Sequence, residues 1–89
     1  MQLQSAVSVR DLHAFEVWVA NMIDLAERSA LRSDESAALK RYQLQTAEMV
    51  RQRITTRIFE EGKAGRRLVP SLRRLNVAIS RMRYGAATH

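Results

Sequence analysis

The segment GKAGRRLVPSLRRLNVAISRMRYGAATH, residues 62–89, contains all three glycines and the only proline of this 89-residue chain. No glycine or proline interrupts residues 1–61, and the alternation typical of β-strands is absent from the sequence. The apolar side chains of the quoted segment recur at spacings of 4, 3, 4 and 3, at Leu68, Leu72, Leu75, Ile79 and Met82. This heptad spacing is typical of a helix that packs on other helices. The sequence therefore predicts an all-α fold.

The glycines and the proline of this segment predict where its helix begins and ends. Residues 62–65 are expected to form a flexible turn, in which Gly62 adopts the left-handed conformation that ends the preceding helix. Pro70 cannot continue a helix but fits a first turn, and Gly85 can end one. We therefore expect the third helix over residues of about 70–84.

A first helix is expected over residues of about 9–31, because Ser8 and Asp11 have the spacing of an N-terminal capping box. Its main apolar row has the three-and-four spacing of one helical face and contains Leu12, Phe15, Val19, Met22, Ile23, Ala26 and Ala30. A second row, formed by Ala14, Trp18 and Leu25, widens the apolar arc beyond what one antiparallel neighbour covers.

A second helix is expected over residues of about 34–61, joined to the first by a short connection at residues 32–33. Only serines and the acidic residues Asp34 and Glu35 indicate this break, so one continuous helix remains an alternative. The expected core face of the second helix contains Leu39, Tyr42, Thr46, Met49 and Val50, and then shifts toward Ala47, Ile54 and Ile58.

These helices predict a single domain over residues 1–89, built as a long antiparallel helical hairpin with a shorter third helix that completes a three-helix bundle. A chain of this length is near the size at which one core is only marginally stabilising. Because the first helix also has an unusually wide apolar arc, we expect the molecule to form a homo-oligomer.

Charge is distributed very unevenly along the chain. Residues 1–61 carry eight basic and nine acidic side chains, whereas residues 62–89 carry seven basic and no acidic side chains. The net charge of +6 therefore comes from the C-terminal third. An exposed helix usually gains stability from neighbouring side chains of opposite charge. Exposure to solvent alone therefore explains poorly why this segment has no acidic residue.

The basic segment predicts nucleic-acid binding, because arginine pairs well with phosphate and an aromatic ring can stack on a base. The expected contact residues are Lys63, Arg66, Arg67, Arg73, Arg74, Arg81, Arg83 and Tyr84.

The alternative is a helical protein–protein adaptor or inhibitor, whose arginines meet an acidic protein surface. Its expected interface lies on the first helix and contains Ala14, Phe15, Trp18, Met22 and Leu25. Attachment to a membrane surface is less favoured, since the basic helix has no Trp or Phe anchor.

The sequence shows no motif for catalysis, and we expect neither enzymatic activity nor a cofactor. His13 and Glu16 have the spacing of two metal ligands on a helix, but no third ligand follows at a matching interval, so no metal site is expected. The absence of cysteine and of a long apolar run predicts a cytoplasmic protein without a membrane span.

Overall fold

The chain folds into helices only. A computed structural model describes residues 2–87, with the side chains of residues 12–84. Its elements are α1 (Gln2–Leu31), α2 (Ala37–Glu61), the 3₁₀-helix η1 (Gly62–Leu68) and α3 (Val69–Ala87). No strand occurs within residues 2–87, and the predicted all-α class is confirmed.

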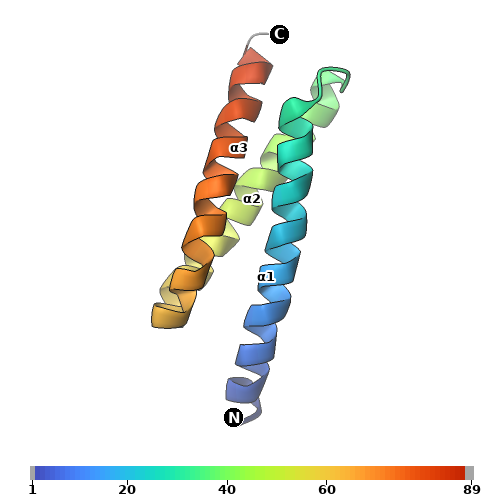
Figure 1. The fold of residues 1–89 in the computed structure, drawn as a ribbon. Helices are drawn as coiled ribbons and strands as arrows, with labels where there is room; N and C mark the ends of the chain where they lie inside the picture. Colours follow the sequence, from blue (N-terminus) through green and yellow to red (C-terminus); the bar gives the residue numbers. More distant parts are fainter. Residues whose placement is uncertain (1, 88–89) are drawn as a thin grey trace.

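The helices lie side by side in an elongated molecule of 51 × 18 × 15 Å (Figure 1). α2, η1 and α3 follow one another without a non-helical residue, so the described chain consists of two uninterrupted helical runs. The second run turns back at η1, and α3 then returns along α1 and α2 (Figure 1). The C-terminal end of α3 and the α1–α2 connection consequently lie at the same end of the molecule.

One hydrophobic core receives side chains from α1, α2, η1 and α3. The apolar seam of the C-terminal segment lies in this core: Leu68, Leu75 and Ile79 are at most 1% exposed, and Leu72 packs against them. On α1, the predicted row supplies Val19 and Ile23. The three-and-four periodicity therefore identified the buried faces of α1 and α3 correctly.

The predicted core face of α2 was wrong for its first half. Tyr42 is 63% exposed and Met49 is 40% exposed, whereas Ala47, Val50 and Ile54 are buried. The α2 sequence contains two apolar rows, and only the packing of α2 against α1 and α3 determines which of the two rows is buried.

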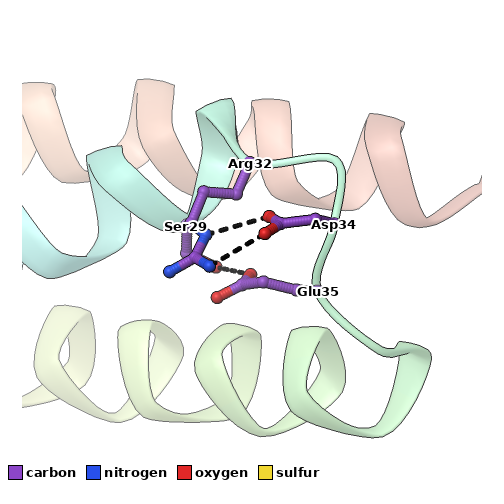
Figure 2. A network of polar contacts seen from close by, with 4 residues as sticks. All are labelled: Ser29, Arg32, Asp34 and Glu35. Carbon is purple, nitrogen blue, oxygen red and sulfur yellow. Dashed lines mark hydrogen bonds and ion pairs between the residues drawn. The ribbon is translucent and has the colours of Figure 1, made fainter.

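A break does separate the first two helices, so the single continuous helix is excluded (Figure 2). The connection is longer than predicted, because Asp34 binds Arg32 within the connection and Glu35 binds Ser29 of α1, so neither residue starts α2. Asp34 accepts two hydrogen bonds of 3.0 Å from Arg32, and Glu35 Oε1 accepts one of 2.8 Å from Ser29 Oγ (Figure 2). Ser36 then caps α2, since its hydroxyl accepts a 3.1 Å hydrogen bond from the Leu39 N–H.

The outer ends of the first and third helices were also misplaced. α1 begins at Gln2, so Ser8 lies inside the helix; the side chains of Ser8 and Asp11 are outside the described set. α3 passes through Gly85 and ends at Ala87, because two alanines follow this glycine and favour helix. Pro70 occupies the first turn of α3, as predicted.

The turn between α2 and α3 is an ordered 3₁₀-helix and not a flexible loop. Gly62 has φ 61° and ψ −121°, so its positive φ was anticipated, but the conformation is not the left-handed helical one. Gly65 is buried, because η1 packs directly on the backbone of α2 at Ile58.

Candidate nucleic-acid interface

The predicted nucleic-acid contacts all lie on η1 and α3. Lys63, Arg66 and Arg67 belong to η1, and the remaining arginines and Tyr84 belong to α3. All eight side chains are exposed. They divide into two groups according to whether a carboxylate of another helix holds them.

Three arginines form ion pairs with glutamates of the facing helices. The pairs are Arg67 with Glu16, Arg74 with Glu27, and Arg83 with Glu48. Arg74 makes the most complete pair, because its Nη2 lies 2.7 Å from Glu27 Oε1 and its Nε lies 3.4 Å from Oε2. These hydrogen bonds raise the pKa of the Arg74 guanidinium.

In the ion pair between Arg67 and Glu16, only one of the two carboxylate oxygens accepts a hydrogen bond. Both carboxylate oxygens of Glu16 lie close to Arg67 Nη2, Oε1 at 3.2 Å and Oε2 at 3.3 Å. Only Oε2 accepts a hydrogen bond from this group, and the buried Oε1 accepts none within the described part of the chain.

These pairs explain part of the charge asymmetry. The carboxylates that balance the C-terminal segment lie on α1 and α2, so mixed-sign neighbours exist between helices and not along α3. Exposed pairs of this kind stabilise a fold by only about 0–1 kcal/mol each. Their main effect is that Arg67, Arg74 and Arg83 are already occupied by carboxylates.

Four cations of the segment remain available. Lys63, Arg66, Arg73 and Arg81 form no ion pair or hydrogen bond with any side chain of residues 12–84. Tyr84 follows Arg73 by three helical turns and therefore shares its face of α3. Its ring is 74% exposed, which leaves it accessible to a ligand beside these cations.

The predicted protein interface on α1 is only partly exposed. Phe15, Trp18 and Met22 are half-buried and pack against the core, whereas Ala14 is exposed and Leu25 is 50% exposed. The Phe15 and Trp18 rings contact each other with centroids 5.6 Å apart. Part of the second apolar row thus contributes to packing between α1 and α2.

A groove of about 580 Å³ between α1 and α2 is bordered by the Phe15 ring. Two arginines of α2 that line the groove also contact the aromatic rings of α1: the Arg53 guanidinium lies 5.8 Å from the Trp18 ring, and that of Arg57 lies 5.3 Å from the Phe15 ring. The groove is lined by Phe15, Met49, Gln52, Arg53, Thr56, Arg57 and Glu60. Sequence reasoning missed the α2 side of this groove, because no local pattern shows which α2 residues face Phe15.

The structure gives the His13 and Glu16 pair no metal-binding arrangement. Glu16 is engaged by Arg67, and His13 is exposed. No group of three metal-ligating side chains occurs within the described residues. None of the helices in this part of the chain is long and apolar enough to cross a membrane.

Comparison with protein-family models, with curated proteins and with solved structures finds no match to this chain.

Proposed function

We propose that the protein binds nucleic acid in the cytoplasm through phosphate contacts made by the unpaired cations of η1 and α3. In this proposal, α1, α2 and α3 act as one three-helix bundle that presents these side chains. The observation that carries the proposal is that Lys63, Arg66, Arg73 and Arg81 are exposed and have no carboxylate partner among the described residues.

The spacing of these side chains suits a phosphate backbone. Arg73 and Arg81 are eight residues apart, which is about 12 Å along the axis of α3. Successive phosphates of one strand rise by about 3.4 Å along a duplex. The two arginines can therefore contact different phosphates, and the exposed Tyr84 ring, one turn beyond Arg81, can stack on an unpaired base.

Two triple variants with the same charge test this proposal. R66A/R73A/R81A removes unpaired arginines, and R67A/R74A/R83A removes arginines held by glutamates. Each variant lowers the net charge from +6 to +3. Any difference between them must come from the position of the charges and not from their number.

The first triple variant is expected to flatten the slope of log affinity against log salt by about 2.7 for duplex DNA or about 2.1 for a single strand. The second is expected to change this slope by less than half as much. Circular dichroism should show that both keep their helix content, since alanine is a good helix former. Equal effects of the two variants, or no binding by the wild type at low salt, would contradict the proposal.

A second candidate function is that of an adaptor, and the groove between α1 and α2 favours it. The groove combines the Phe15 ring with Met49, Arg53 and Arg57, residue types that are common in protein interfaces. A complex with an acidic protein surface, or with a second copy, that survives high salt would support this function in place of the first.

A further inference from the structure

A second, much smaller cavity lies at the end of the molecule where α1 ends and α2 begins. It has a volume of about 20 Å³ and is lined by Ser29, Ala30, Lys40, Arg81 and Met82. These residues come from α1, α2 and α3, whose ends meet here (Figure 1). The volume admits a single water-sized group, such as one oxygen of a larger anion.

Two cations from different helices share this cavity. Lys40 is half-buried on α2, and Arg81 is exposed on α3. Neither forms an ion pair or a side-chain hydrogen bond with any group of residues 12–84. Two positive charges at one small site repel each other, and an anion placed between them would remove this repulsion.

The neighbouring carboxylates do not supply that anion. Both oxygens of Asp34 accept hydrogen bonds from Arg32, and Glu35 Oε1 accepts one from Ser29 (Figure 2). Hydrogen bonds from Arg32 are the largest cause of the lowered pKa of Asp34, and the charge of Lys40 is a smaller one. Asp34 is thus close enough to Lys40 for the lysine charge to lower its pKa, but both of its carboxylate oxygens accept hydrogen bonds from Arg32.

We propose that Lys40 and Arg81 together bind one phosphate group at this cavity. Ammonium and guanidinium groups both donate charge-assisted hydrogen bonds to phosphate oxygens. One phosphate oxygen enters the cavity, and the rest of the group stays outside, as a phosphodiester of a continuous strand requires. The inference rests on the proposed nucleic-acid binding and extends its surface from α3 to Lys40 of α2.

The variant K40Q tests this inference, and R41Q is its matched control. Arg41 is the next residue of α2, is exposed, and does not line the cavity. Both variants remove one positive charge. K40Q should weaken binding of a short DNA oligonucleotide by about tenfold, the effect of losing one charge-assisted hydrogen bond. R41Q should weaken it much less.

The double variant K40Q/R81Q shows whether the two side chains bind the same phosphate. If they do, the loss of affinity in the double variant is smaller than the product of the two single losses, because either substitution already disrupts the shared contact. The shared site would be overturned if the affinity loss of the double variant equalled the product of the two single losses. Equal effects of K40Q and R41Q would overturn it as well.

Inorganic phosphate, titrated at constant ionic strength against chloride, separates this inference from the proposed function. Phosphate should shift the NMR signals of both Lys40 and Arg81 in the wild type and in R41Q, and it should no longer shift the Arg81 signal in K40Q. Phosphate that leaves these signals unchanged would overturn the site, even if DNA binds elsewhere. If phosphate shifts these signals but the oligonucleotide does not bind, the anion site is supported, and nucleic acid is refuted as the source of the bound phosphate group.

Discussion

At the residue scale, Gly65 is a position where the neighbouring backbone leaves no room for a side chain. A Cβ atom placed there would lie 2.7 Å from the carbonyl oxygen of Ile58 and 2.8 Å from its Cα. Both contacts are with backbone atoms, so a rotamer change cannot relieve them. The close approach of η1 to α2 therefore requires glycine at this position.

We expect the variant G65A to lower the free energy of unfolding by about 1–3 kcal/mol, because η1 must move away from α2. Urea denaturation followed by circular dichroism measures this change. K63A, which alters an exposed side chain of the same 3₁₀-helix, should stay within about 0.5 kcal/mol of the wild type. A G65A protein as stable as K63A would show that the contact is not tight.

Asp34 is expected to make the stability of the protein depend on pH. The hydrogen bonds from Arg32 hold the pKa of its carboxyl below the ordinary value of 3.8. Since the pKa is lower in the folded state, the stabilisation is complete at pH values above 3.8 and is lost as the pH falls through the folded-state pKa. An NMR titration should give a pKa below 3.8 in the wild type and a higher value in R32Q. Equal pKa values in both proteins would refute the contact.

At the element scale, the start of α2 depends on one hydroxyl group. Ser36 caps the helix through its bond to the Leu39 N–H, whereas Ser33 makes no side-chain hydrogen bond within residues 12–84. S36A should therefore reduce stability by about 0.5–2 kcal/mol, and S33A should have little effect. Thermal unfolding of the two variants provides the comparison. If S33A were the more damaging substitution, α2 would begin earlier than Ser36.

At the scale of the whole molecule, the apolar surface between α1 and α2 bears on self-association. Leu25 of α1 and Met49 of α2 are 50% and 40% exposed, and Met49 also lines the larger groove. A second copy of the chain would bury this surface. The homo-oligomer that the wide apolar arc of the first helix predicted therefore stays a prediction.

Light scattering at tens of micromolar is expected to give the mass of a dimer or larger assembly for the wild type, because mass action favours association at such concentrations. L25E should shift the equilibrium toward the monomer, since a carboxylate on this face would lose its hydration in the interface. V77E, a matched change at a 51% exposed position on α3, should leave the assembly intact. A monomeric wild type would contradict the prediction.

The sequence alone was sufficient for the helical class and for the buried faces of α1 and α3. Glycine and proline are confined to residues 62–89, and the apolar spacing from Leu68 to Met82 needs only the geometry of one helix to be interpreted. The basic character of the C-terminal third is likewise a property of composition. Each of these features depends on residues within a few turns of each other.

The tertiary structure alone decided which row of α2 is buried and which arginines are occupied. Arg67 and Glu16 are 51 positions apart, Arg74 and Glu27 are 47 apart, and Arg83 and Glu48 are 35 apart. No local periodicity links residues at such separations. Lys40 and Arg81 meet at one cavity for the same reason: α3 returns along α1 and α2, and this packing places together charges that the sequence keeps far apart.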